Sequence, residues 1–374
     1  MFPILIILIF IRPFISSLAY PCLNITYSSI LLAFLLAWII LKGLSLKEIK
    51  PLQYPLIFFV LALAASVTFS SDKINSLNEL YKYAVAILLF LIVIPLPDNE
   101  KRSIINTIII SGIVIGILAI YQYFFGFKHI LNYIAREKIS SPFILDYLNR
   151  KRAFSPFVTP NTLAGYLILV MPLVLTVEGK KKWVIFLLLS TALFLTKSVG
   201  AIMSLFLGML FYLCLKKSLS VKGISLLLFA AMACIFVFIL RQAATSKYLA
   251  PIFSISRRID YWQDTLEIIK RHPFAGVGIG NFNLPLTNYA HNSYLQIWAE
   301  MGIFGLISFL WIVGSIFKSG FQNINISPYK KQIAGLLTAN AIFIIHNFSD
   351  FTFFLPEVAF IWWMILGIIL FKKK

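Results

Sequence analysis

The polar residues at 291–296, His-Asn-Ser-Tyr-Leu-Gln, form a segment that could carry out acid–base chemistry. The imidazole of His291 can take a proton from a hydroxyl near neutral pH, which few other side chains can do. We therefore take His291 as a candidate general base, in the first turn of an apolar helix, with Asn292 and Tyr294 as candidate substrate contacts. Helical spacing would put Glu300 on the opposite side of that helix. The alternative for His291 is a hydrogen-bonding residue at the boundary of the apolar helix.

A second candidate group lies on residues 255–271, which predict an amphipathic helix that ends before Pro273. Arg258 lies beside the apolar face of this helix, and Arg257 precedes it. A guanidinium suits phosphate because its planar fork donates two parallel hydrogen bonds. The apolar face consists of Ile259, Trp262, Leu266 and Ile269.

Polar residues also interrupt apolar runs elsewhere in the chain. Lys197 occupies a turn between two short apolar segments, where a cation either has a function or extends its ammonium group toward water. His346 and Asp350 are four residues apart and share a face if the helix continues through both. A metal site formed by these two residues and His291 is conceivable, but no metal-binding spacing supports it. We predict neither a metal nor a cofactor.

The composition indicates that an integral membrane protein positions these residues. Hydrophobic residues make up 60% of the 374 residues and charged residues 13%, whereas soluble domains have about 45–50% and 25%. Such a chain has too little polar surface to coat a soluble particle. The net charge of +19 lies largely in short patches between apolar segments. We therefore attribute much of it to orientation in a lipid bilayer and predict no nucleic-acid partner.

Runs of about 20 apolar residues predict an all-α polytopic protein with about twelve transmembrane helices, in a range of ten to twelve. Residues 1–374 would form a single integral membrane domain. The seventh and eighth spans are short and could form a hairpin that does not cross fully. The predicted spans are 2–20, 24–41, 52–70, 80–97, 103–126, 158–177, 183–196, 199–215, 223–241, 291–317, 332–348 and 355–371.

The basic residues of the short loops predict the orientation, because such loops face the cytoplasm. They occur in every second loop, so both termini are expected to be cytoplasmic. Residues 127–157, which include Arg152, and residues 242–290 would then be long extracytoplasmic loop regions, each with six basic residues when Arg241 at the edge of the second is counted. These basic loops either contact lipid headgroups or form an electropositive basin for an anionic substrate such as a lipid diphosphate.

Several motifs in order resemble the bacterial O-antigen ligase and O-antigen polymerase family. The resemblance covers roughly residues 155–310, with a weaker similarity at His346 and Asp350. The motifs are Pro160-Asn161-x-x-Ala164-Gly165-Tyr166-Leu167, Arg258-x-x-x-Trp262, His272-Pro273-x-x-Gly276-Val277-Gly278-x-Gly280-Asn281-Phe282, and His291-Asn292-x-Tyr294-Leu295-Gln296 followed by Glu300-x-Gly302.

This resemblance implies a metal-independent glycosyltransferase with a C-type, all-helical membrane fold. Members of the family move a glycan from undecaprenyl diphosphate to an acceptor hydroxyl on the periplasmic side of the membrane. By analogy, Arg258 would hold the diphosphate, and His291 would be the general base or would orient the acceptor. The family usually has Thr-x-Ser-Arg-Gly at the turn between the short helices, where this chain has Val199 in place of the Arg. Lys197 is the candidate replacement for that charge.

Within this family, the compact length and the single very long outer loop favour an O-antigen ligase that joins a lipid-diphosphate-linked polysaccharide to a lipid A–core acceptor. The alternative within the family is a polymerase, whose acceptor is another lipid-linked repeat unit. An alternative of a different class is a transporter or flippase for the lipid-linked sugar. The sequence shows no inverted repeat, and its polar residues gather at the outer face rather than at mid-membrane, which disfavours transport.

Overall fold

The computed structural model describes residues 1–44, 49–50, 52–137, 150–216 and 251–370, together with a few isolated positions between these ranges. In this part of the chain the regular structure is helical and no β-strand is present, which confirms the predicted all-α class. The α-helices are α1 (Phe2–Ile11), α2 (Pro21–Lys42), α3 (Gln53–Thr68), α4 (Lys73–Val93), α5 (Asp98–Tyr121), α6 (Phe127–Arg136), α8 (Pro160–Val174), α9 (Lys181–Thr196), α10 (Val199–Leu215), α12 (Pro251–Arg271), α13 (Ser293–Ile326), α14 (Lys330–His346) and α15 (Pro356–Ile368).

Four helical segments are long and apolar enough to cross a membrane: α2, α4, the stretch Asp98–Arg136, and α13 over Ser293–Ile324. Shorter apolar helices accompany them, including α3, α8, α10 and α15. The chain therefore has the helices of a multi-pass membrane protein, whereas the number of twelve spans stays a prediction. The predicted span at 223–241 lies mostly outside the described residues.

Two boundaries differ from the prediction for identifiable reasons. Helix α4 begins at Lys73, seven residues before the predicted span 80–97, because the Asp72 side chain accepts hydrogen bonds from the backbone N–H groups of Ile74 and Asn75. Helix α5 continues through a π-helical turn at Gln122–Gly126 into α6. The first ten residues of the predicted loop 127–157 are thus helical.

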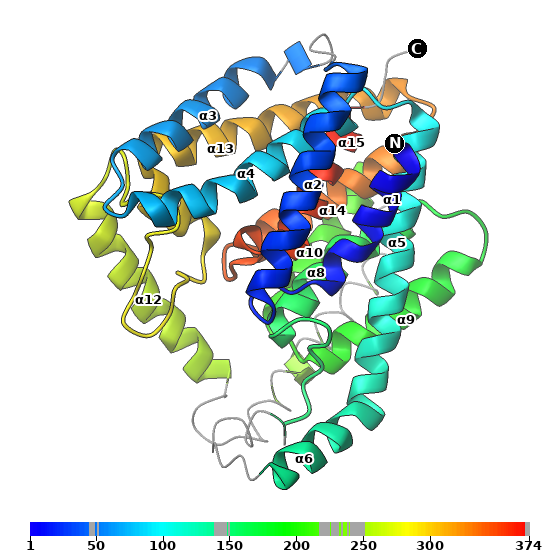
Figure 1. Cartoon of the computed structure of the whole chain (residues 1–374). Coiled ribbons are helices and arrows are strands. Elements are labelled where there is room, and N and C mark those ends of the chain that lie inside the picture. Colours follow the sequence, from blue (N-terminus) through cyan, green and yellow to red (C-terminus); the bar gives the residue numbers. More distant parts are fainter. Residues whose placement is uncertain are drawn as a thin grey trace.

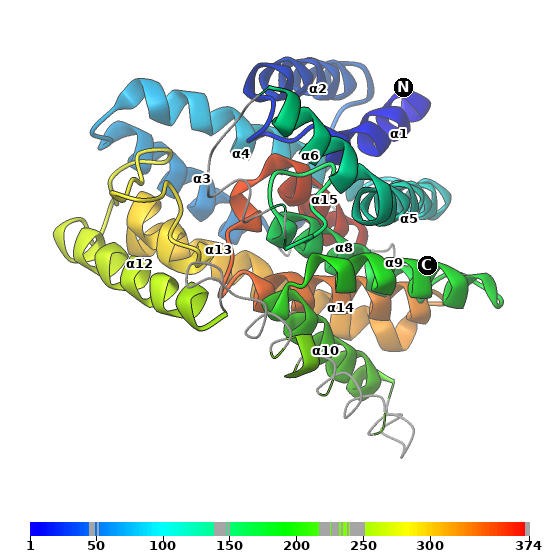
Figure 2. The same ribbon diagram turned by 90° about the horizontal axis from the view of Figure 1, so that it is seen from below.

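Three helices form the interior of the molecule. Every residue of α14 from 333 to 343 and of α15 is buried, as is all of α8 except Asn161. The other helices surround them, and the N-terminus lies toward the end opposite α6 (Figures 1 and 2). Large apolar side chains are exposed on the surrounding helices, such as Ile40, Phe58 and Trp183. An apolar outer surface suits a lipid environment.

Helix α13 is kinked at Gly302, whose φ of 69° is not helical. The kink frees backbone groups that a regular helix would use internally. The Glu300 carbonyl accepts hydrogen bonds from Gly278 N at 3.0 Å and from Ser66 Oγ at 2.7 Å, and Ile303 N donates to Pro273 O at 2.9 Å. The glycine-rich segment 273–280 is thereby fixed against the middle of α13.

Candidate active site

His291 lies just before α13, in a left-handed backbone conformation with a φ of 51°. The helix begins at Ser293 and has Asn292 as its N-cap, so the prediction that His291 occupies the first helical turn is wrong. The imidazole ring packs between two aromatic rings. It stacks on Tyr261 of α12 at 5.6 Å between centroids and meets Phe351 edge-on at 4.8 Å. Both neighbours hold the ring in one orientation.

The surroundings of His291 keep its imidazole neutral near pH 7. Burial lowers its pKa to about 4, while the negative charge of Asp350 acts to raise the pKa and the positive charge of Arg258 lowers it. The Nδ1 atom of His291 is buried and has no hydrogen-bond partner among the described residues. A neutral imidazole with an open nitrogen can accept a hydrogen bond or a proton from a hydroxyl group.

Arg258 lies on α12, three residues before Tyr261 and half-buried. Within the described chain its guanidinium forms no hydrogen bond or ion pair. The adjacent Arg257 is different, because its Nη1 lies 3.9 Å from Asp260 Oδ2 on an exposed part of the helix. Arg258 therefore offers a guanidinium without an acidic partner, close enough to His291 to influence its titration.

A buried polar group at the end of α14 connects this region to the membrane helices. Helix α14 ends at His346, yet His346 Nε2 still lies 3.7 Å from Asp350 Oδ2, and both side chains are buried. Asp350 Oδ1 accepts a hydrogen bond from Phe351 N at 2.8 Å. Ser293 Oγ donates to Asn347 Oδ1 at 2.7 Å and contacts Asp350 O at 3.2 Å. These bonds fix the carboxylate of Asp350 beside the start of α13.

Arg152 is buried in a second polar cluster, formed at the start of α8 and the turn between α9 and α10. Its Nε donates to Thr196 O at 2.8 Å, and its Nη2 donates to Asn161 Oδ1 at 3.0 Å. Ser198 Oγ donates to the same Asn161 oxygen at 3.1 Å. The guanidinium of Arg152 therefore lies at the turn where the family usually has an Arg and this chain has Val199.

Lys197 has a left-handed φ of 53°, and its Nζ donates to Arg150 O at 2.9 Å. Its ammonium group thus binds the backbone of the segment that carries Arg152. The polar cluster around Arg152 also borders the polar group that contains His346. One helical turn beyond Asn161, Gly165 leaves the space that the imidazole of His346 occupies, since a Cβ there would lie 3.1 Å from Nε2.

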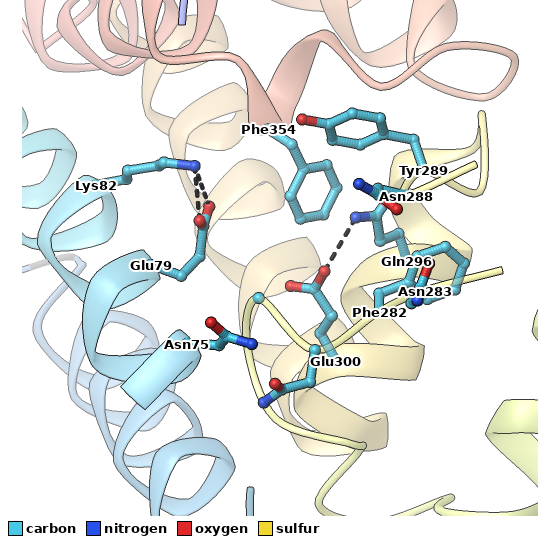
Figure 3. A pocket seen from close by; sticks show the side chains of 12 residues that line it. Asn75, Glu79, Lys82, Phe282, Asn283, Asn288, Tyr289, Gln296, Glu300 and Phe354 are labelled. Atoms are coloured by element: carbon cyan, nitrogen blue, oxygen red, sulfur yellow. Dashed lines mark hydrogen bonds and ion pairs between the residues drawn. The ribbon is translucent and has the colours of Figure 1, made fainter. Parts of the chain in front are cut away.

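A cavity of about 440 Å³ lies between α4 and α13 and is also lined by Asn288 and Tyr289 (Figure 3). Glu79 and Lys82 of α4 form an ion pair in it, with Lys82 Nζ at 2.8 and 2.6 Å from the two carboxylate oxygens. Opposite them, Gln296 Nε2 donates to Glu300 Oε1 at 2.9 Å. Among the described residues, no group of three His, Cys, Asp or Glu side chains is placed to hold a metal ion.

The structure brings His291, Arg258 and Asp350 together. The two predicted substrate contacts Asn292 and Tyr294 form hydrogen bonds within the protein. The Asn292 side chain accepts hydrogen bonds from the N–H groups of Tyr294 and Leu295, as a helix cap. The Tyr294 hydroxyl donates to Ile344 O at 2.8 Å and so joins α13 to α14.

The cavity was not predicted from the sequence. Glu79 lies one residue before the predicted span 80–97, and the helical spacing used for Glu300 counted from His291, which lies outside the helix. The signal that could have revealed it was Asp72, a good N-cap residue seven positions before Glu79.

A comparison with sequence models of protein families matches residues 184–310 to the family described as O-antigen ligase. The matched segment contains the turn at 196–200, α12, the glycine-rich segment and the first part of α13. A search of curated proteins gives no match. The family match agrees with the resemblance seen in the motifs and includes Arg258, His291 and Glu300. Residues 184–310, about a third of the chain, are thus similar to the O-antigen ligase family, and the described helices are those of a multi-pass membrane protein.

Proposed function

We propose that the protein is an O-antigen ligase-type glycosyltransferase, which moves a polysaccharide from undecaprenyl diphosphate to a hydroxyl of a lipid A–core acceptor. The single observation that carries this proposal is the pairing of an arginine that has no acidic partner in the described chain, Arg258, with a buried neutral His291 inside the family domain. One group suits an anionic leaving group and the other suits a hydroxyl nucleophile.

The proposed reaction needs positioning and charge stabilisation more than strong base catalysis. The acceptor oxygen forms a bond to the anomeric carbon while the bond from that carbon to the diphosphate oxygen breaks. The diphosphate leaves with the electron pair, and Arg258 stabilises its charge. The hydroxyl becomes strongly acidic as its new bond forms, so a weakly basic His291 suffices to take the proton. Asp350 stabilises the resulting imidazolium.

Other predicted residues would complete the binding surface. We propose that Arg152 and Lys197, at the turn that lacks the family's Arg, face the donor, and that Arg257 lies at the rim of the same basin. Asn292, Tyr294 and His346 would support His291 and Asp350 through the contacts described above. The site would face the periplasm, with about twelve spans and both termini in the cytoplasm. No metal or other cofactor takes part in this scheme.

The products of purified protein with an undecaprenyl-diphosphate-linked glycan test this proposal. One reaction contains lipid A–core as acceptor and the other only more donor, each with and without EDTA. A glycan adduct of lipid A–core, formed also with EDTA, is expected. Longer glycans without that adduct would identify the polymerase of the same family. Loss of activity in EDTA that added divalent metal restores would contradict the metal-independent scheme.

A further inference from the structure

The cavity between α4 and α13 contains a buried carboxyl group whose hydrogen bonding is incomplete. Glu300 is 3% exposed, and its Oε1 accepts the hydrogen bond from Gln296. Its Oε2 is also buried and has no partner among the described residues. Figure 3 shows the carboxyl group turned toward the open space that Glu79 and Phe354 border. A buried oxygen without a partner is costly, so a ligand that donates to it would gain free energy.

The ionisable groups that line the cavity leave no cation for an anionic ligand. Two carboxyl groups, on Glu79 and Glu300, line it together with a single ammonium group, on Lys82. That ammonium group already binds both oxygens of Glu79. The cavity therefore offers no free cation to a phosphate, unlike the surroundings of Arg258. The diphosphate is expected to bind elsewhere.

The remaining lining suits a neutral ring that carries hydroxyl groups. A side-chain amide is planar and both donates and accepts hydrogen bonds, so it can bind two adjacent hydroxyl groups. Aromatic faces pack against the C–H faces of such a ring. The cavity supplies both, because the amides and aromatic rings alternate along the segment 281–289 and α13 completes the wall. The amides are Asn75, Asn281, Asn283, Asn288 and Gln296, and the rings are Phe282, Tyr289 and Phe354.

The cavity is close to His291. Tyr289, which lines it, stacks on Phe351 at 4.1 Å between ring centroids, and Phe351 in turn meets the imidazole of His291 at 4.8 Å. This pair of rings links the cavity to the candidate base. A glycan whose reacting end lies at His291 could therefore place a neighbouring sugar in the cavity.

We propose that this cavity binds a neutral sugar ring of the glycan next to the reacting group, through hydroxyl donors to Glu300 and Glu79. The inference rests on the proposed transferase function and adds the chemical class of the ligand, a neutral sugar, that this part of the site binds. The sugar belongs either to the donor polysaccharide or to the acceptor core, since both present the same hydroxyl chemistry.

Binding of free glycans, measured without transfer, tests the proposal. The probes are the glycan released from the lipid-linked donor by mild acid, the core oligosaccharide released from lipid A–core, and inorganic diphosphate. Saturation-transfer NMR would compare wild-type protein in detergent with Glu300→Gln and Glu79→Gln. The matched control is Glu267→Gln, because Glu267 forms the same type of pair three residues from Lys270, at 2.7 Å, on the exposed face of α12.

The expected result is that one of the two glycans binds the wild type and the control, and binds both cavity variants at least about tenfold more weakly. Which of the two glycans shows this loss identifies donor or acceptor as the source of the sugar. Diphosphate binding should be unchanged in all four proteins. Equal glycan binding by all four proteins, or glycan binding to none, would overturn the inference, as would loss of diphosphate binding in the cavity variants alone.

These measurements distinguish failure of the cavity proposal from failure of the proposed function. If the protein has transfer activity but both cavity variants bind glycan as the wild type does, the cavity assignment is refuted and the transferase function stands. Glycan binding that depends on Glu79 and Glu300, without any transfer by wild-type protein, would refute the transferase and support the cavity. Apparent melting temperatures of all variants check that the buried substitution at Glu300 leaves the protein folded.

Discussion

Arg258 and Arg257 are neighbours on α12 with different surroundings, and this difference permits a matched test. Arg258→Lys keeps the positive charge but replaces a planar fork by a point donor. We expect kcat/KM to fall by about 10- to 100-fold, the range for losing one hydrogen bond to a charged group. Arg257→Lys should change it by less than about threefold, because Arg257 pairs with Asp260 at the surface. Equal activity of Arg258→Lys and wild type would rule out bidentate binding of diphosphate at Arg258.

The depressed pKa of His291 predicts an unusual acidic limit of activity. The neutral imidazole is the active form, so kcat/KM should fall only as the pH drops through about 4, rather than through about 6.5 as for an ordinary histidine. Asp350→Asn removes the charge that raises this pKa and should move the limit to still lower pH. A limit near pH 6.5 in the wild type would contradict the buried neutral histidine.

The same shift in pKa lowers the stability of the folded protein in acid, although it extends the activity of the neutral imidazole to lower pH. The unfolded chain protonates His291 near its ordinary pKa of about 6.5, whereas the folded chain does so near 4. Stability from this group is therefore complete above about pH 6.5 and declines as the pH falls toward 4. Incubation at each pH followed by assay at pH 7 separates reversible titration from unfolding.

At the level of residues, Arg258, His291 and Asp350 could be chosen as candidates from the sequence because of their types and spacing, and the structure places them near one another. It could not show that His291 has a left-handed backbone or that two aromatic rings hold it. Those rings come from α12 and from the segment after α14, which only the tertiary fold brings together. Glu79 escaped notice because its partners across the cavity lie more than 200 residues away.

At the level of elements, the kink in α13 predicts that adding one methyl group at Gly302 destabilises the protein. Gly302→Ala introduces a Cβ in a left-handed conformation and directly against the backbone of Phe274. We expect a loss of at least about 1–2 kcal/mol from the backbone conformation alone, seen as a lower apparent melting temperature together with reduced transfer activity. Gly314 lies in the same helix with nothing within 4 Å of a Cβ, so Gly314→Ala should be neutral or stabilising. Wild-type stability of Gly302→Ala would contradict the kinked geometry.

Most helices could be predicted from apolar runs, because hydrophobic length is a strong signal in a membrane chain. Their ends depended on local chemistry that the runs do not contain. The Asp72 cap starts α4 early, and the π-helical turn at Gln122–Gly126 carries α5 into α6. The helix predicted at 255–271 is confirmed as part of α12, but Ile259 and Leu266 of its predicted apolar face are exposed, and Ile269 packs with Tyr261 and Ile268 instead.

At the level of the whole molecule, the proposed orientation predicts which residues react from outside the cell membrane. After replacement of Cys22, Cys214 and Cys234, a single cysteine would be placed at the exposed Lys73 or the exposed Glu178. A membrane-impermeant maleimide should label Lys73→Cys in intact spheroplasts, because α4 is proposed to begin at the periplasmic side. Glu178→Cys should react only after permeabilisation. The reverse pattern would place the candidate site in the cytoplasm and contradict a periplasmic transferase.

The proposed role of His291 in glycan transfer from a lipid diphosphate can be measured in one assay. Purified wild type and His291→Ala would receive the undecaprenyl-diphosphate-linked glycan and lipid A–core, with product formation followed over time. We expect a lipid A–core adduct from the wild type and a rate at least about 100-fold lower from the variant, as for loss of a general base. Full activity of folded His291→Ala, or no product from wild type with either acceptor, would contradict it.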